Sequence, residues 1–130
     1  MEGFMARIYL VEDDRNLANL TKVALVKKGY EVVVFHEALK AIEEIKKRKP
    51  DLILMDVMMP GVSGAEAVKE LRKDTNLAKI PVIFLTGLIG GEEEDVEHKG
   101  INIDGINYKT LGKPYEIDQL LKMVGSVARL

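Results

Sequence analysis

The sequence contains no cysteine, so it forms neither a disulfide framework nor a thiolate metal site. It also contains no long apolar run. No stretch approaches the roughly 20 apolar residues that a membrane helix needs, and residues 1–7 lack the apolar core of a signal peptide. Acidic and basic residues nearly balance, and the net charge is −2. This charge gives no reason to expect a basic face that binds nucleic acid. These absences predict a cytoplasmic protein that binds neither nucleic acid nor a membrane directly.

The length and composition are those of one globular domain. The chain has 130 residues, of which 47% are hydrophobic and 31% charged. A chain of this size buries roughly two-thirds of its unfolded surface, which is enough for a proper core. We therefore expect a single domain over residues 1–130, with its core at about 6–129.

Short apolar runs alternate with segments of helical periodicity along the whole chain. The predicted strands are Ile8–Val11, Glu31–Phe35, Leu52–Met55, Val82–Leu85 and a segment within 106–111. The apolar residues that mark helices are Leu17, Leu20, Val23 and Ala24, then Ala38, Ala41, Ile42 and Ile45, then Ala65, Val68 and Leu71 after the N-cap Ser63, and finally Ile117, Leu120, Leu121, Val124 and Val127. This alternation predicts an α/β fold, a five-stranded parallel sheet that is doubly wound by helices on both faces.

Acidic side chains follow two of the predicted strands. Glu12, Asp13 and Asp14 follow the first strand, and Asp56 ends the third, between the apolar run at 52–55 and a Pro-Gly turn. The carboxyl ends of parallel strands share one edge of the sheet, where α/β proteins bind ligands. Carboxylates that are gathered there repel one another, and a hard cation such as Mg²⁺ removes the repulsion.

Two further residues at the same predicted edge are suited to phosphate. Thr86 ends the fourth strand and offers a hydroxyl donor, and Lys113 follows the fifth strand and offers a positive point charge. A single Asp after a strand is more often a turn or helix-cap residue than a nucleophile. The joint occurrence of these residues in this order predicts phosphoryl transfer to a carboxylate nucleophile.

With these residues placed, the chain closely resembles the receiver domain of bacterial two-component response regulators, which has the CheY-like, flavodoxin-like fold. The segments that carry the resemblance are IYLVEDD at 8–14, DLILMDVMMPGVSG at 51–64, IPVIFLTG at 80–87 and KPY at 113–115. The block at 56–64 and the Lys-Pro pair are specific in combination. The resemblance covers nearly the whole chain.

The resemblance implies a role for each residue at the edge. Asp56 accepts the phosphoryl group. Glu12 and Asp13 hold Mg²⁺ together with Asp56, Asp13 being the more direct ligand, and Met58 lends its backbone carbonyl.

The remaining roles also come from the resemblance. The Thr86 hydroxyl moves toward the phosphoryl group, and Lys113 pairs with the phosphate and with Asp56. The Lys113–Pro114 peptide is expected to be cis. The phosphodonor is a phosphohistidine on a sensor histidine kinase or phosphotransfer protein, and the output is a changed contact with a downstream protein. Such a domain is a signalling phospho-acceptor rather than an enzyme. The apolar residues Met58 and Leu88 imply slow loss of its phosphoryl group.

The sequence departs from the family in its last third. Thr110 occupies the position, three before Lys113, where the family usually has an aromatic switch, and Tyr108 lies two residues earlier on the same face of the strand. Twenty-seven positions separate Thr86 from Lys113, which is longer than usual. The segment 92–99 has one apolar anchor, so we expect an atypical connection between the fourth and fifth strands, with a short, displaced or missing helix.

Three other functions compete with a phosphorylated receiver. The first is a receiver-like adaptor that acts through protein contacts without phosphorylation. The second is a phosphatase with an aspartyl nucleophile, which needs a general acid where Met58 stands. The third is a nucleotide-binding protein, which the glycine-free acidic loop after the first strand disfavours. His36 and His98 are expected to lie far from the acidic pocket, with no metal or catalytic role.

Overall fold

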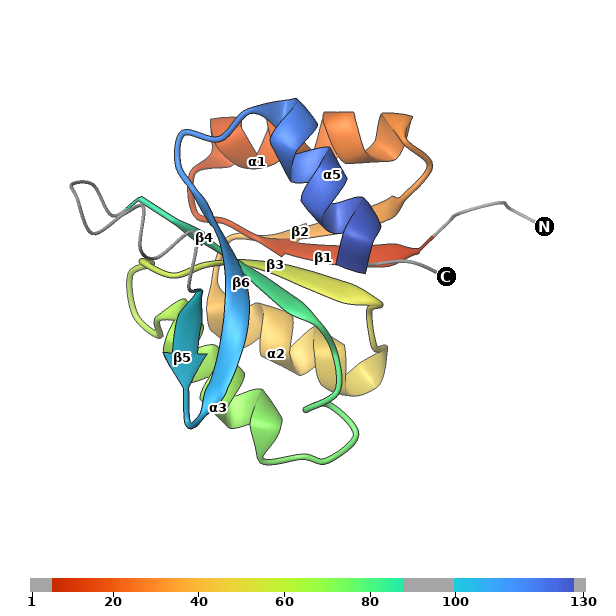
Figure 1. Cartoon of the computed structure of the whole chain (residues 1–130). Coiled ribbons are helices and arrows are strands. Elements are labelled where there is room, and N and C mark those ends of the chain that lie inside the picture. The colour runs from red at the N-terminus through yellow and green to blue at the C-terminus, as the bar shows by residue number, and fades with distance from the viewer. Residues whose placement is uncertain (1–5, 88–99, 128–130) are drawn as a thin grey trace.

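Strands and helices alternate along the chain in this computed structural model, which describes residues 6–87 and 100–127 (Figure 1). The elements are β1 (Arg7–Val11), α1 (Arg15–Lys27), β2 (Glu31–Phe35), α2 (Ala38–Lys47), β3 (Leu52–Asp56), α3 (Gly64–Arg72), β4 (Val82–Thr86), β5 (Ile101–Ile103), β6 (Ile106–Gly112) and α5 (Ile117–Val127). The strands and helices predicted within the described residues are all present. The segment 92–99, where a short, displaced or missing helix is expected, lies outside those residues.

The sheet has the strand order β2-β1-β3-β4-β6-β5, and its first five strands are parallel. Helices α1 and α5 cover one face, and α2 and α3 cover the other (Figure 1). The predicted doubly wound α/β fold is therefore confirmed. Because the five strands are parallel, the chain leaves all of them at the same edge of the sheet.

The sheet has a sixth strand that the sequence did not predict. Strand β5 pairs antiparallel with β6 at the edge of the sheet, and Ile103 lies opposite Ile106. Asp104 and Gly105 between them both have positive φ, 51° and 89°. An Asp-Gly pair with this geometry makes a two-residue hairpin turn, whose twist matches that of the strands. An apolar pattern of three residues is too short to identify such a strand beforehand.

The buried face of α1 differs from the predicted one. Ala18, Thr21 and Leu25 are buried, whereas Leu20 and Val23 are 63% and 45% exposed. The two stripes are neighbours on the helix, and the periodicity alone does not decide between them. The small side chains of Ala18 and Thr21 let α1 pack closely on the sheet, which places the larger residues of the other stripe toward solvent.

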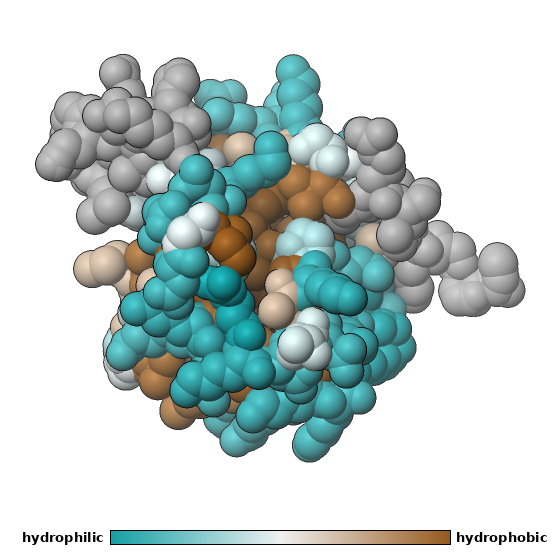
Figure 2. All heavy atoms as spheres, turned by 60° about the horizontal axis from the view of Figure 1, so that its bottom comes forward, coloured by the Kyte–Doolittle hydropathy of each residue, from teal (hydrophilic) through white to brown (hydrophobic). Residues whose placement is uncertain are grey.

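Two apolar clusters lie on opposite faces of the sheet, because successive residues of a strand point to opposite sides. Ile8 and Leu10 of β1 pack with α1 and α5, and Tyr9 and Val11 pack with α2 and α3. Outside these layers the surface is mostly hydrophilic, as Figure 2 shows for one face. No helix within the described residues combines the length and the apolarity that crossing a membrane requires.

Gly64 lets the start of α3 approach the end of β3. A Cβ atom at this position would lie 2.3 Å from the carbonyl oxygen of Asp56 and 2.9 Å from Cγ of Met55. The neighbouring Ser63 forms a capping box with Glu66, which is the N-cap that the sequence predicted. The contact between Gly64 and Asp56 thus couples the packing of α3 to the backbone of the acidic edge.

We predict that Gly64→Ala lowers the free energy of unfolding by about 1–3 kcal/mol, because the backbone atoms it meets do not move aside freely. Gly125→Ala in α5 is the matched control, since a Cβ there meets nothing within 4 Å. The control should gain roughly 0.5–1 kcal/mol from helix propensity. Urea unfolding measures both values, and equal stability of the two variants would contradict the packing described.

Candidate functional site

Three side chains at the carboxyl edge of the sheet share one side of it. Glu12, Asp56 and Lys113 each follow by two positions a leucine of the cluster beneath α1 and α5, namely Leu10, Leu54 and Leu111. The sheet pairing continues to this point, because the backbone N–H of Glu12 donates to Phe35 and that of Lys113 donates to Thr86. The period of two along strands therefore brings three residues that are far apart in the sequence to one place.

The Lys113 ammonium lies between the two acidic side chains. Its Nζ is 2.5 Å from Oε1 of Glu12, and it donates a hydrogen bond of 3.1 Å to Oδ2 of Asp56. Glu12 is 1% exposed and Asp56 is 3% exposed. Two carboxylates and one ammonium are thus removed from water together, which leaves an excess of negative charge.

The excess of negative charge perturbs both titrating partners. Burial, and then the charge of Glu12, raise the pKa of Asp56 to about 7, against the opposing effect of Lys113. Burial lowers the pKa of Lys113, but its contacts with Glu12 and Asp56 outweigh this and hold that pKa above its usual value. Lys113 therefore stays charged, and Asp56 binds a proton readily when no other cation is present.

The acidic edge has the composition of a divalent-cation site. Ligand oxygens of Glu12, Asp13 and Asp56 lie within 4.8 Å of one another. The buried Oε1 of Glu12 makes no hydrogen bond among the described residues beyond its ion pair with Lys113. These residues line a cleft of about 440 Å³. An all-oxygen donor set at an open cleft suits a hard cation that keeps several waters, as Mg²⁺ does.

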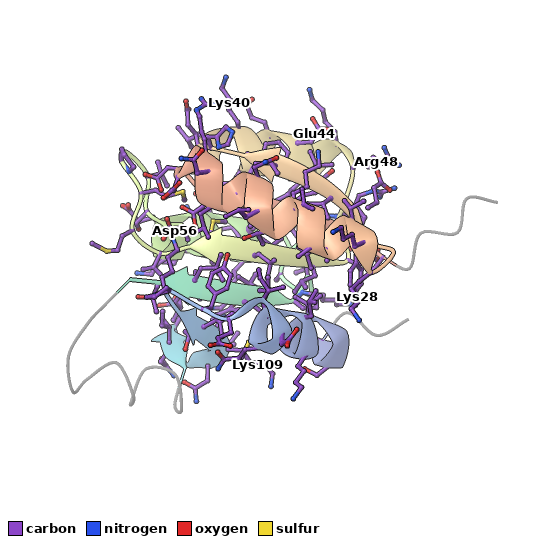
Figure 3. All side chains as sticks on the ribbon, turned by 90° about the horizontal axis from the view of Figure 1, so that it is seen from above. Lys28, Lys40, Glu44, Arg48, Asp56 and Lys109 are labelled. Carbon is purple, nitrogen blue, oxygen red and sulfur yellow. The ribbon has the colours of Figure 1, made fainter. Side chains whose placement is uncertain are left out.

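The structure also locates the other two predicted site residues. The backbone N–H of Met58 donates to Oδ1 of Asp56 at 3.2 Å, and the Met58 side chain, 64% exposed, lines the cleft. Thr86 is 1% exposed at the end of β4, where its carbonyl accepts from the Lys113 N–H at 2.7 Å. Lys113–Pro114 is cis, as expected. Figure 3 shows Asp56 at one end of the sheet and Lys28 and Arg48 near the opposite end.

Three neighbours of the site were missed or misplaced by the sequence. His36 was expected far from the acidic pocket, and this is wrong, because its Nδ1 lies 2.9 Å from the carbonyl oxygen of Glu12. Asp14 is the N-cap of α1, and its N–H donates to Oε2 of Glu12. Tyr115 reaches Thr21 of α1 through its hydroxyl. His36 follows β2, which lies next to β1, so the strand order would have placed it correctly. His98 lies outside the described residues.

Packed side chains occupy the part of β6 where the family usually has its aromatic switch. Thr110 is 1% exposed on β6, and Tyr108 makes an edge-on contact with Phe84, with ring centroids 5.6 Å apart. The ring of Tyr108 on β6 thus packs against a ring of the neighbouring strand β4. This contact supports the interpretation of Tyr108 as a core or rim residue rather than a displaced switch.

Comparison with known proteins agrees with this geometry. A family model described as the response regulator receiver domain matches residues 8–125. The phosphate regulon transcriptional regulatory protein PhoB of Pseudomonas aeruginosa is 35% identical over 122 residues, which are 94% of this chain and 51% of PhoB. The chain therefore spans about half the length of this relative.

Two solved structures share the fold. The Francisella response regulator 1452 receiver domain has a TM-score of 0.79 and 28% identity, over 95% of this chain and 97% of that one. The receiver domain of sensor histidine kinase PA1611 from Pseudomonas aeruginosa has a TM-score of 0.79 and 25% identity, with the same coverage, and it is described with a magnesium ion in its active-site cleft. The match over most of its length, with which the contacts between the lysine and the buried carboxylates agree, shows that this chain belongs to the response regulator receiver domain family.

Proposed function

We propose that Asp56 accepts a phosphoryl group from a phosphohistidine of a sensor histidine kinase or phosphotransfer protein. The observation that carries this proposal is a buried carboxylate held against a lysine at the floor of an acidic cleft. Burial makes the negative charge of this carboxylate unfavourable, so a cationic partner that offsets the charge stabilises the ionised carboxylate. The proposed output is a changed contact with a downstream protein, and the predicted cytoplasmic location suits such partners.

In the transfer, a carboxylate oxygen of Asp56 forms a bond to phosphorus while the bond between phosphorus and the histidine nitrogen breaks. The released imidazole takes up a proton. The Met58 N–H and the Lys113 ammonium each bind one oxygen of Asp56, so the orientation of the carboxylate is fixed before the donor arrives. Catalysis by this site is mainly positioning and electrostatic stabilisation.

Mg²⁺ fits the donor set and would be held by Glu12, Asp13 and Asp56, with the backbone carbonyl of Met58 as a further ligand. Its chemical contribution is to offset the charge of the phosphoryl oxygens. Lys113, which lines the same cleft and pairs with Glu12 and Asp56, supplies a second positive charge. The Thr86 hydroxyl is proposed to bind a third phosphoryl oxygen after a movement of its loop, which shifts the population of conformers.

The acyl phosphate formed on Asp56 is open to attack by water. Met58 presents an apolar side chain over the cleft and offers no group that would orient a water molecule. We therefore propose that hydrolysis is slow, so that the domain turns over its phosphoryl group without acting as an enzyme on other substrates. Leu88, the second residue implicated in water access, lies outside the described residues.

We predict that Mg²⁺ raises the thermal stability of the parent chain at pH 8 and that Asp13→Asn removes most of this response. The reason is that Asp13 is the exposed member of the acidic trio Glu12, Asp13 and Asp56, and is therefore the first ligand that an entering ion meets. Asp14→Asn is the matched control, since asparagine caps a helix as well as aspartate does and Asp14 is outside the trio. Thermal unfolding against Mg²⁺ concentration measures the effect. An equal response in all three proteins would contradict this metal site.

We predict that the parent chain, incubated with a small phosphodonor and Mg²⁺, gains the mass of one phosphoryl group, and that Asp56→Asn gains none. An amide carries no carboxylate to form the acyl phosphate. Intact-mass spectrometry measures this directly. A parent chain that stays unmodified while it binds Mg²⁺ and remains folded would favour the alternative function, a phosphorylation-independent adaptor.

A further inference from the structure

One partly buried pair of hydroxyl groups near the site has no part in the mechanism above. Oγ1 of Thr21 in α1 lies 2.6 Å from the hydroxyl of Tyr115, which follows Lys113 by two positions. Thr21 is completely buried, and Tyr115 packs against the cluster beneath α1 and α5. Burial raises the pKa of Tyr115, so its phenol stays protonated, and either hydroxyl can donate in this hydrogen bond.

The pair anchors the segment that carries Lys113. Lys113 directly follows β6, and its backbone N–H still holds it to the sheet through a hydrogen bond to the carbonyl of Thr86. Pro114 has no N–H to donate and is exposed, and α5 begins only at Ile117. Between the sheet and α5, the Tyr115 side chain supplies a tertiary hydrogen bond that ties this connection to α1.

The same helix also fixes the other end of the ion pair. Asp14, the N-cap of α1, donates its N–H to Oε2 of Glu12 at 3.1 Å, which leaves Oε1 facing Lys113. About two turns further along α1, Thr21 holds Tyr115. Glu12, α1, Tyr115 and Lys113 thus form a closed ring of contacts, in which the helix sets the separation between the acid and the lysine.

We infer that Tyr115 is a positioning residue for phosphotransfer, which acts through Thr21 to hold the Lys113 ammonium between Glu12 and Asp56. The inference rests on the proposed function of Asp56. Without the hydroxyl bond, the 113–116 segment keeps its packing but loses its fixed distance from α1. The ammonium then samples positions in which it contacts one carboxylate rather than two.

The test compares Tyr115→Phe, Thr21→Val and the double variant with the parent chain, using a small phosphodonor and Mg²⁺. We expect the maximal phosphorylation rate of each to fall roughly tenfold while the donor concentration for half-maximal rate stays unchanged. Because both changes remove the same bond, the double variant should be no slower than the slower single variant. If the fold-losses in phosphorylation rate of the two single variants multiply in the double variant, the two residues act independently and the inference is wrong.

Tyr9→Phe is the control for a merely structural role. Its hydroxyl donates to the carbonyl of Arg48 at 2.7 Å, at the opposite edge of the sheet. This variant should lose thermal stability to a similar extent as Tyr115→Phe and keep the parent rate. If Tyr115→Phe slows phosphorylation no more than Tyr9→Phe does, Tyr115 only stabilises the fold and the inference is wrong.

A second measurement separates this inference from the proposed function. The ¹⁵N resonance of the Lys113 ammonium, recorded in the unphosphorylated protein, reports its hydrogen bonding without any phosphotransfer. We expect a slowly exchanging signal in the parent and in Tyr9→Phe, and a broadened or lost signal in Tyr115→Phe. An unchanged signal would refute the positioning role, whatever Asp56 does, whereas a parent chain that gives the signal but takes no phosphoryl group refutes only the proposed function.

Discussion

The structure depends on one partly buried lysine that lies between two buried acids. Lys113 contacts Glu12 and Asp56; Asp56 ends β3, and Glu12 and Lys113 directly follow β1 and β6. Removing one partner of such a buried group leaves an uncompensated charge, which generally costs several kcal/mol. The register of three strands, the position of α1 and the path of the chain into α5 all serve to keep these charges together. The fold is therefore arranged around a site that carries a deficit of positive charge.

This deficit links protonation, cation binding and stability. The pKa of Asp56 is about 7 in the folded chain, against 3.8 for an unperturbed carboxyl. Between about pH 4 and pH 7 the folded chain thus holds a proton that the unfolded chain has released. By linkage, the contribution of Asp56 to stability falls as the pH rises through this window. A divalent cation in place of the proton would offset this negative charge, so the excess of carboxylates favours metal binding, and the bound cation would in turn reduce the repulsion of an anionic phosphoryl group.

The sequence predicted the parallel sheet, its helices and the residues of the site, because buried strands and the groups that end them leave a strong local pattern. Glu12, Asp13, Asp56 and Lys113 meet as expected, since parallel strands share one carboxyl edge. Contacts that depend on packing were not predictable. The buried stripe of α1, the three-residue strand β5 and the approach of His36 to Glu12 are set by neighbouring elements rather than by local periodicity.

The most direct test of the account is the titration of the Asp56 carboxyl carbon by ¹³C NMR in the metal-free protein. Burial beside Glu12 predicts an apparent pKa of about 7, and the value should fall when Mg²⁺ is added. Because Glu12 interacts with Asp56, the Glu12→Gln variant should lower the value as well. Titration of Asp56 near 3.8 in the metal-free chain, with no response to Mg²⁺ or to Glu12→Gln, would contradict the central claim that the site is short of positive charge.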